Sequence, residues 1–451
     1  MKQPDRRTTP RASGMRAVGV ALTAAAIGAG CAPRGGPAPT RVEFWTTDHE
    51  QDRMAIQRKL ARRFETVHPQ WKIQVIGVPE NDLPKRLAAY RAAGRSPEVI
   101  RLGLELVAGY AEQGILDPSA ASRVVAELGE DTFFAGPLRL LRMNDGRYAA
   151  VPIDGWVQCL WYRRDLFEKA GLDPPATWDA MLKAARALNE PDERSYGIVL
   201  GTDPQQVYTQ QTFEHLALSG GLRLFDAEGR PALERALTER VFAFYRDLAD
   251  CGPPGNCYWR EARKYYLSGR AAMVFYSPYI VDDIAGFAEG QDPVADLARH
   301  TDFVSVIEGH GGNSASYGQV VSLALTPAPD EETAAAARAW VKFLLSDAYL
   351  EICNMSPGGK VPVRKTVVAE WKQHPYFRHY PRDLPDRLAG AMDGLQRWGW
   401  RDGRRFPAIT DVCARKIVPA AVGEVLRRRM EPSRAFERLQ NELKAILPPE
   451  P

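Results

Sequence analysis

Aromatic residues stand beside polar residues at several places in this sequence, and such combinations can bind sugars. The chain has 10 Trp and 16 Tyr among 451 residues. A pyranose ring has an apolar face that stacks on aromatic rings, and its hydroxyls need donors and acceptors such as Asp, Glu, Arg and Gln. Three runs combine these types: Asp154-Gly155-Trp156, Phe275-Tyr276-Ser277-Pro278-Tyr279 and Trp398-Gly399-Trp400-Arg401. They indicate noncovalent recognition of a polyhydroxylated molecule.

Signatures of covalent or metal-dependent catalysis are missing from the sequence. The run from Gly309 to Gly312 is similar to an oxyanion loop, but no Gly-x-Ser-x-Gly elbow accompanies it. No His-Glu-x-x-His motif, Walker loop or dinucleotide fingerprint occurs. A glycosidase that uses a pair of carboxylates stays possible as an alternative, because the 56 acidic residues offer many candidate pairs. We therefore expect no catalytic residue, no cofactor and no metal.

The first thirty residues have the pattern of an export signal. A basic segment ending at Arg16 precedes an apolar run over residues 17–27, which is too short to cross a bilayer comfortably. Gly28-Ala29-Gly30-Cys31 follows, a lipobox pattern similar to that of bacterial lipoproteins. We expect a signal peptide over residues 1–30, lipidation of Cys31 and a Pro/Gly-rich tether over residues 31–40. The alternatives are an ordinary secretory signal and a short membrane helix.

The five cysteines after the signal would lie in an oxidising compartment, where disulfides are permitted. Cys251 and Cys257 enclose a tight Pro/Gly turn, and we predict a disulfide between them. The spacing gives no support to a Cys353–Cys413 pair, and Cys159 stands in an apolar run typical of a buried hydrophobe. Zinc is not expected, because no two cysteines have ligand spacing with a nearby His.

Composition and charge place the chain among ordinary soluble proteins. Hydrophobic residues make up 45% and charged residues 25%, which disfavours disorder and coiled coils. The net charge of +3 originates in the first thirty residues, which carry +4. Without them the chain has 54 basic and 55 acidic residues, so a nucleic-acid partner is not expected.

The segment after residue 40 alternates between strand and helix patterns. Strands are predicted at 42–45, 71–76 and 99–100, and helices at 54–68, 83–93 and 106–113. A further helix over 179–188 has Thr177 as its N-cap. Such alternation predicts an α/β fold with a largely parallel sheet, whose ligands sit beyond the carboxyl ends of the strands. The loops 46–49 and 101–105 are then the natural binding loops.

Five further runs identify a family resemblance. The run YAAVPIDGWVQCLWYRRDLFEKAGLDPPATWDAMLKAARAL (148–188) resembles the crossover segment of extracellular solute-binding proteins of carbohydrate ABC importers, to which maltose-binding proteins belong. Other parts resemble the family in the same order: RRFETVHPQWKIQV, SGRAAMVFYSPYI, AARAWVKFLLSD and GGKVPVRKTV. The resemblance spans roughly residues 41–447, so it is far more specific than any single motif.

The resemblance implies an α/β, two-lobe periplasmic-binding-protein fold of type II, with discontinuous lobes joined by hinge crossings. The N-terminal lobe would hold residues 41–153 and 321–360. The C-terminal lobe would hold residues 154–320 and 361–451. The crossings would lie near residues 152–156, 320–325 and 361–363, and the ligand would sit in a cleft that closes by hinge motion.

The resemblance also implies ligand-binding residues in both lobes. Tyr279 stands where relatives commonly carry a stacking Trp, and Glu105 matches an acidic binding position of maltose-type relatives. The other candidates come from the loops, the crossover and the C-terminal segment: Thr47, Asp48, His49, Arg101, Asp154, Trp156, Tyr208, Gln210, Tyr276, Trp398 and Trp400. Core packing or a solvated surface would explain many of them equally well. Leu102 replaces a stacking Trp of those relatives, which argues against a long maltodextrin ligand.

The implied function is that of a monomeric, lipid-anchored binding protein, on the periplasmic or cell-surface side of the membrane. Its partners would be a carbohydrate, the membrane, two ABC permease subunits and their ATPase. A first alternative keeps the fold but binds a polyol, a glycerol-phosphate ester or another compatible solute, and a phosphate would need Arg101 or Arg401 in the cleft. Less favoured alternatives are a surface polysaccharide enzyme and a binder that serves a sensor kinase.

Overall fold

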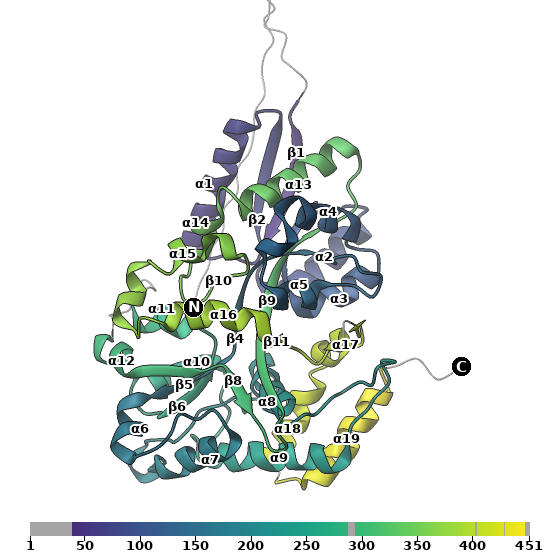
Figure 1. Cartoon of the computed structure of the whole chain (residues 1–451). Helices are drawn as coiled ribbons and strands as arrows, with labels where there is room; N and C mark the ends of the chain where they lie inside the picture. Colours follow the sequence, from purple (N-terminus) through teal and green to yellow (C-terminus); the bar gives the residue numbers. More distant parts are fainter. Residues whose placement is uncertain (1–37, 287–293, 402–403, 428, 447–451) are drawn as a thin grey trace, which may run out of the picture. The chain divides into compact units, whose positions relative to one another are not determined.

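The first described elements of the chain build the parallel part of a mixed sheet. The computed structural model describes residues 38–286, 294–401, 404–427 and 429–446, and residues 39–451 group into one unit by their contacts. The first elements are β1 (Thr40–Thr46), α1 (Gln51–Val67), β2 (Trp71–Gly77), α2 (Leu83–Ala92), β3 (Val99–Gly103) and α3 (Leu104–Glu112). β1 pairs in parallel with both β2 and β3 (Figure 1). Every predicted element of this part is present.

Two long strands extend this sheet, β4 (Val151–Val157) and β9 (Ser314–Leu325), and β9 runs antiparallel to β3 and β4. The described strands follow the order β10-β4-β9-β3-β1-β2, with β10 at Val361–Pro362. β8 (Val306–Glu308) and β11 (Leu395–Gln396) also pair with β9. The three segments that the sequence suggests as crossings are thus the neighbouring strands β4, β9 and β10, which lie together in the middle of Figure 1.

Glycine is required where β4 and β9 meet. A Cβ atom on Gly155 would lie 2.5 Å from the Gln319 carbonyl oxygen, and one on Gly318 would lie 2.3 Å from that of Trp156. Real Cβ atoms do not approach backbone oxygens so closely, so a side chain at either position would push the strands apart. The glycine between Asp154 and Trp156 therefore sets how both side chains are presented.

A second sheet has three antiparallel strands in the order β6-β5-β7. They are β5 (Cys159–Arg163), β6 (Met273–Tyr276) and β7 (Thr301–Val304). The helices that follow β4 are α6 (Arg164–Ala170), α7 (Trp178–Ala187), α8 (Val207–Ser219), α9 (Arg235–Ala249), α10 (Trp259–Leu267), α11 (Tyr279–Ile284) and α12 (Ala295–His300). As predicted, Thr177 caps α7, because its hydroxyl accepts a hydrogen bond from the Ala180 N–H.

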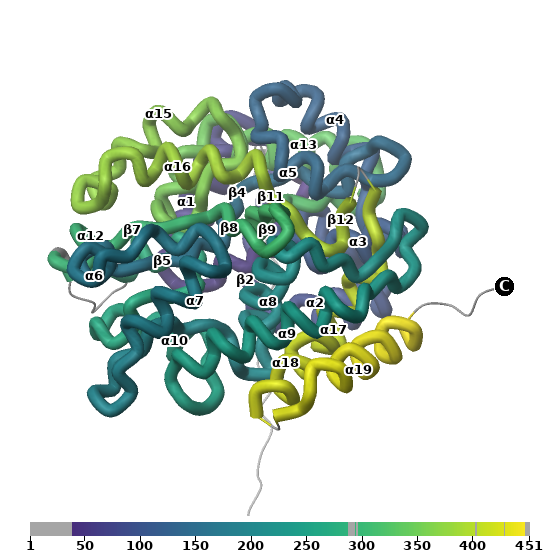
Figure 2. The backbone as a smooth tube through the Cα atoms, turned by 60° about the horizontal axis from the view of Figure 1, so that its bottom comes forward, coloured from purple at the N-terminus to yellow at the C-terminus, as the bar shows by residue number. Residues whose placement is uncertain are grey.

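The remaining described elements cover the large sheet and form the C-terminal part. They are α4 (Pro118–Leu128), α5 (Ala135–Leu141), α13 (Glu331–Leu345), α14 (Tyr349–Cys353), α15 (Val368–Trp371), α16 (Leu384–Gly390), α17 (Ile409–Ala414), α18 (Ile417–Arg427), α19 (Pro432–Lys444), β12 (Trp400–Arg401) and β13 (Arg404–Arg405). Short 3-10 turns lie at Glu80–Asp82, Glu130–Thr132, Pro191–Glu193, Lys365–Val367, Pro375–His379 and Ala391–Gly394. α19 packs along α9 in both views (Figures 1 and 2).

The predicted Cys251–Cys257 disulfide is wrong, since both cysteines are free in the structure. The Cys251 thiol donates to the Asp247 carbonyl oxygen of α9 at 3.6 Å, and the Cys257 thiol donates to the Tyr258 carbonyl oxygen at 3.7 Å. The two side chains pack into different hydrophobic clusters. The turn between them therefore separates the thiols instead of joining them. Cys159 is buried, as expected, and Cys353 and Cys413 are also free.

The predicted signal peptide, the Cys31 lipidation site and most of the tether lie outside the described residues. Within the described ranges, no helix has both the length and the apolar character needed to cross a membrane. The same ranges hold no group of three or more His, Cys, Asp or Glu side chains placed to bind a metal ion.

Candidate functional site

A cavity of about 500 Å³ is bordered by α1, the end of β4, α8, α10, β6 and α11. Aromatic side chains dominate its lining: Trp156, Tyr208, Trp259, Tyr276 and Tyr279. Four of these five are residues that the sequence singled out, and they come from separate segments of the chain. We call this hollow the aromatic cavity. Its size and its mixture of rings and polar groups are typical of small-molecule sites.

The rings of the aromatic cavity are held by their surroundings. The Tyr208 hydroxyl donates to the Phe275 carbonyl oxygen at 2.5 Å, which fixes the ring against β6. Gly359 lies so close to the Tyr279 ring that a Cβ atom there would be 2.2 Å from it. One face of Tyr279 is therefore covered by backbone. Trp156 is half-buried, and its ring lies 6.3 Å from that of Tyr317. Rings fixed in this way lose little conformational freedom when a ligand stacks on them.

A buried hydrogen-bond donor without a partner lines the same cavity. Gln158 is only 1% exposed, and its side-chain nitrogen has no acceptor among the described residues. Its backbone N–H is already used, donating to the Tyr317 carbonyl oxygen at 2.7 Å. Buried polar groups are rarely left unpaired, because each costs about 1–3 kcal/mol of desolvation. An acceptor from a ligand, such as a hydroxyl oxygen, would satisfy this amide.

The charged groups of the aromatic cavity are already paired within the protein. The Arg263 guanidinium contacts the Asp283 carboxylate at 2.9 Å. Arg53 lies 3.4 Å from Glu50 and 3.5 Å from Asp48. Pairing of this kind leaves little free charge to hold an ionic ligand, so the cavity is best suited to a neutral molecule with many hydroxyls.

Asp282 connects α11 to the segment before β10. Its carboxylate accepts hydrogen bonds from the Ser356 hydroxyl and from the N–H groups of Gly358 at 2.7 Å and Gly359 at 2.9 Å. Burial raises the pKa of Asp282 to about 6, although these three hydrogen bonds act to lower it. The carboxyl thus binds its proton more tightly in the folded protein than in the unfolded chain.

This shift predicts a pH dependence of stability. Because its pKa is raised on folding, Asp282 stabilises the fold fully below about pH 4, and this contribution disappears as the pH rises through 6. When the pH falls from 7.5 to 4.5, we expect the free energy of unfolding of the wild type to rise by about 2 kcal/mol relative to that of Asp282→Asn. Urea unfolding at both pH values measures it. The exposed Asp173→Asn is the control, and an equal pH response of wild type and Asp282→Asn would contradict the expectation.

Three predicted ligand contacts instead form a buried group with Lys360, which we call the ionic cluster: Asp48, Arg101, Asp154 and Lys360. The Lys360 ammonium lies 2.9 Å from Asp48 and 3.3 Å from Asp154. The Arg101 guanidinium lies 2.7 Å from Asp154 and 3.3 Å from Asp48, and it donates to the Thr47 hydroxyl at 2.8 Å. Lys360 is fully buried. These side chains therefore bind one another, and none of them lines the aromatic cavity.

Opposite charges keep Asp48 and Arg101 of the ionic cluster ionised. Burial alone would raise the pKa of Asp48, but Arg101, Lys360 and Arg53 outweigh it and hold this pKa well below its usual range. Burial would lower the pKa of Arg101, but Asp154 and Asp48 raise it. Arg53 lies beside Asp48 and also lines the aromatic cavity, so the cluster supports one wall of the site.

Three other predicted contacts lie away from the aromatic cavity. Arg397 pairs with Glu105 at 3.1 Å and with Glu214 at 3.1 Å, and the Gln210 amide donates to Glu214 at 3.4 Å. Trp398 is buried and donates from its indole N–H to the Leu222 carbonyl oxygen at 2.9 Å. Glu105, Gln210 and Trp398 thus have partners inside the protein, and both glutamates contact the same arginine, which is distant in the chain.

The last two predicted contacts also lie outside the aromatic cavity. His49 is exposed, and its ring Nδ1 lies 3.1 Å from the Thr47 carbonyl oxygen. Trp400 lines a different hollow. Sequence reasoning missed Gln158, Trp259, Arg263 and Asp283. Gln211, the neighbour of the predicted Gln210 on α8, lines the aromatic cavity. Trp259 follows Tyr258 directly, an aromatic pair that could have been noticed.

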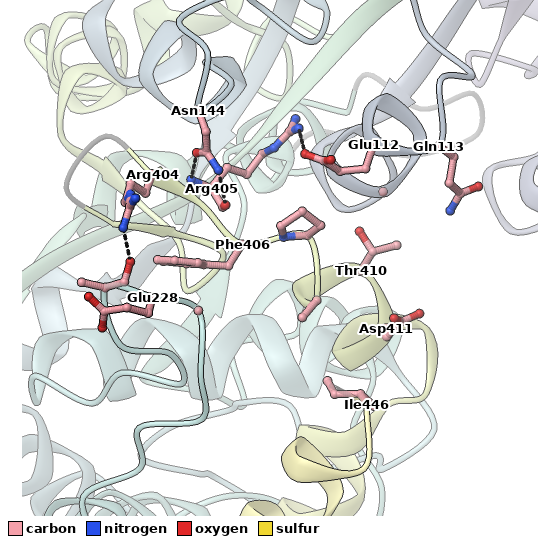
Figure 3. A pocket seen from close by; sticks show the side chains of 15 residues that line it. Glu112, Gln113, Asn144, Glu228, Arg404, Arg405, Phe406, Thr410, Asp411 and Ile446 are labelled. Atoms are coloured by element: carbon pink, nitrogen blue, oxygen red, sulfur yellow. Dashed lines mark hydrogen bonds and ion pairs between the residues drawn. The ribbon is translucent and has the colours of Figure 1, made fainter. Parts of the chain in front are cut away.

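A larger cavity, of about 670 Å³, lies between α3, the β12–β13 hairpin, α17 and the end of α19 (Figure 3). Its side chains are mostly charged or amide groups, and Phe406 is its single aromatic ring among the described lining residues. Arg405 pairs with Glu112 at 3.1 Å, and Asn144 hydrogen-bonds the Arg405 backbone. A single ring and this charged rim fit a sugar less well than the aromatic cavity does.

Comparisons with known proteins agree with this fold. The family described as bacterial extracellular solute-binding protein matches residues 47–351. YcjN of Escherichia coli (strain K12), described as an ABC transporter periplasmic-binding protein, is 31% identical over 95% of this chain and 97% of its own length. A mannitol-binding protein of Pseudomonas aeruginosa is 26% identical over 69% of this chain and 72% of its own.

Solved structures share the architecture at lower identity. An ABC transporter solute-binding protein of Agrobacterium radiobacter K84, in complex with ribitol, superposes with a TM-score of 0.73 at 21% identity, over 91% of this chain and 99% of its own. Maltose-bound MalE3 of T. maritima superposes with a TM-score of 0.71 at 22% identity, over 90% of this chain and 100% of its own. These relatives are binding proteins and not enzymes, and they confirm the predicted two-lobe α/β fold of type II. The chain belongs to the bacterial extracellular solute-binding proteins, the binding components of ABC transporters.

Proposed function

We propose that this protein captures a neutral carbohydrate, a mono- to oligosaccharide, in the aromatic cavity and delivers it to an ABC permease. The observation that carries the proposal is the composition of that cavity. Five aromatic side chains line it together with Gln158, whose buried amide nitrogen has no partner in the described part of the chain. Rings stack on the apolar face of a sugar, and the free amide donor can bind a hydroxyl oxygen.

The proposed mechanism is capture by closure of two lobes around the ligand. We assign residues 41–153 and 321–360 to one lobe, and residues 154–320 and 361–451 to the other. Glu50 and Arg53 of the first segment and Trp259 and Tyr276 of the second line the same cavity, so a ligand there would contact both lobes. A ligand that binds the closed form better shifts the population toward it, and the closed form would dock on the permease.

Anchoring and assembly complete the proposal. The lipobox pattern before Cys31 supports a diacylated cysteine after signal cleavage, which would hold the protein, a monomer, at the outer side of a membrane. Two permease subunits and a cytoplasmic ATPase would be its partners.

A polyol is the second candidate ligand, and the mannitol-binding relative favours it. A linear polyol offers the same hydroxyls but a smaller apolar face. A glycerol-phosphate ester is less consistent with the site, because Arg101 is bound to Asp48 and Asp154 and Arg401 does not line the cavity.

A thermal-shift screen of the purified protein tests the ligand class. The panel holds mono-, di- and oligosaccharides, polyols and glycerol phosphates. A ligand at 100 times its dissociation constant adds about 2.7 kcal/mol to the stability of the folded state. We expect a neutral sugar or polyol to raise the melting temperature. A shift with glycerol phosphates alone would contradict the neutral-ligand proposal and leave the family assignment intact.

A further inference from the structure

The start of α11 contacts two segments that lie far from it in the chain. Tyr279 is the first residue of this helix, and Asp282 lies in its first turn. The Arg53 guanidinium of α1 lies 6.0 Å from the centre of the Tyr279 ring. Residues 356–359, between α14 and β10, lie against both Tyr279 and Asp282. We call the meeting point of these three segments the α11 junction.

Asp282 accepts the hydrogen bonds of the α11 junction. Its side chain is buried, and both carboxylate oxygens accept from residues 356–359. The Gly358 N–H donates to one oxygen at 2.7 Å, and the Gly359 N–H at 2.9 Å and the Ser356 hydroxyl donate to the other. Hydrogen bonds to a charged acceptor contribute more than those between neutral groups. One side chain of α11 thus holds three donors of the neighbouring segment.

Two glycines permit this close approach. A Cβ atom on Gly358 would lie 2.7 Å from the Pro278 carbonyl oxygen, and one on Gly359 would lie 2.2 Å from the Tyr279 ring. Only a residue without a side chain fits at either position. The bare backbone can therefore reach Asp282 with its N–H groups and cover a face of the Tyr279 ring at the same time.

Both neighbours of α11 are connected to Asp48, in the loop after β1. Arg53 lies 3.5 Å from the Asp48 carboxylate. Lys360, which directly follows residues 356–359, lies 2.9 Å from the same carboxylate, and its backbone N–H donates to the Ser356 carbonyl oxygen at 2.8 Å. The ionic cluster therefore holds together the two segments that α11 contacts.

The α11 junction forms one wall of the aromatic cavity. Arg53, Tyr279, Asp282 and Ser356 all line that cavity. In the lobe assignment proposed above, α11 belongs to one lobe, whereas Arg53 and residues 356–359 belong to the other. The same residues would therefore make contacts between the lobes and form a wall of the ligand site.

We propose that Asp282 is a positioning residue of the sugar site, which holds the start of α11 against residues 356–359 and so fixes Tyr279 beside the captured ligand. This inference rests on the proposed function, because it assumes that the ligand lies between the lobes. Asp282 acts through Tyr279 and not by stacking on the sugar. A ligand enters the open form before the junction is made, so loss of the junction speeds release and leaves association nearly unchanged.

Stopped-flow tryptophan fluorescence tests the proposal, because Trp156 and Trp259 line the cavity and can report binding. The ligand is the sugar or polyol that gives the largest thermal shift. We expect Asp282→Ala to raise the rate constant of release about tenfold, the order of effect of losing a charged hydrogen-bond acceptor, and to leave association within about threefold. Asp282→Asn keeps one acceptor oxygen and should release ligand more slowly than Asp282→Ala. Ser356→Ala removes a single donor and should have a smaller effect than Asp282→Ala.

Asp302→Ala is the matched control. Asp302 is a partly buried carboxylate that accepts a hydrogen bond from Arg387 at 2.6 Å, and it does not line the cavity. Both rates of this variant should stay within about twofold of wild type. A double-variant cycle tests whether Asp282 acts through Tyr279. In a Tyr279→Ala background, Asp282→Ala should raise the release rate by less than about threefold.

The possible outcomes separate this inference from the proposed function. Equal release rates of wild type and Asp282→Ala would overturn the inference and leave the sugar site intact. An undiminished effect of Asp282→Ala in the Tyr279→Ala background would also overturn it, because Asp282 would then act without Tyr279. Release from Asp282→Asn as fast as from Asp282→Ala would contradict a role for the acceptor oxygens. A wild type that binds no sugar or polyol would instead refute the proposed function, and the inference with it.

Discussion

Lys360→Met is expected to lower the free energy of unfolding by about 3–5 kcal/mol at pH 7.5, because it leaves two buried carboxylates with one arginine. Lys360 is fully buried and lies within 3.3 Å of both Asp48 and Asp154. The four side chains of the ionic cluster have no net charge, so removal of the ammonium leaves them with a charge of −1. Arg53, which lies 3.5 Å from Asp48 and also pairs with Glu50, offsets this charge only in part. Methionine fills a similar volume, and the loss therefore reports charge more than packing. Urea unfolding of wild type and variant measures it.

A second substitution separates charge balance from lost packing. Asp154→Asn in the Lys360→Met background removes the extra negative charge, since Asp48 and Arg101 still pair. We expect the double variant to be more stable than Lys360→Met alone. Lys169→Met, at an exposed position of α6, should change stability by less than about 0.5 kcal/mol. A double variant less stable than Lys360→Met would mean that the cluster acts through its hydrogen bonds and not through its net charge.

The positions of the first strands and helices could be predicted within a few residues from the sequence. Apolar residues such as Leu60 and Phe64 recur at helical spacing, and the local pattern alone determines that face of α1. The cap at Thr177 is equally local. The family resemblance supplied the long-range order of the chain, including the neighbouring positions of β4, β9 and β10, which no local pattern encodes.

The candidate site was predicted only in part, and charge explains the difference. Trp156, Tyr208, Tyr276 and Tyr279 line the aromatic cavity. Asp48 and Asp154 were also reasonable sugar contacts. Lys360 binds them instead, from 312 and 206 positions away in the chain. A sequence shows that a carboxylate is present but not which distant cation neutralises it. The same holds for Glu105, whose partner is Arg397.

The cysteine prediction failed for a related reason. The six-residue separation of Cys251 and Cys257 makes a disulfide possible, but the direction of each side chain depends on what it packs against. Cys251 lies two residues beyond the end of α9, and its thiol donates back to the Asp247 carbonyl oxygen in the last turn of that helix. Cys257 packs with the hydrophobic cluster that contains Tyr208 and Tyr276. Each thiol is buried in a different hydrophobic cluster, so no disulfide joins them although the two residues are close in sequence.

Trp156→Ala is expected to raise the Kd for the sugar or polyol that gives the largest thermal shift by about 30-fold, which corresponds to about 2 kcal/mol. Trp156 lines the aromatic cavity from the end of β4, next to the ionic cluster residue Asp154. Its loss removes a stacking surface that is already oriented, so both apolar contact and preorganisation decline. Isothermal titration with that ligand measures the change.

Trp400→Ala is the matched control, because it removes the same side chain from a separate hollow beside the β12–β13 hairpin, outside the aromatic cavity. We expect it to leave sugar affinity within about twofold, whereas the sequence resemblance alone assigned both tryptophans to the ligand. A 30-fold loss in Trp400→Ala with none in Trp156→Ala would move the sugar to the β12–β13 hairpin. Equal melting temperatures of the two unliganded variants would show that neither substitution causes a folding defect. Since Gln158 follows Trp156 by two residues and faces the same cavity, Gln158→Leu should weaken binding in parallel, by loss of a donor instead of a ring.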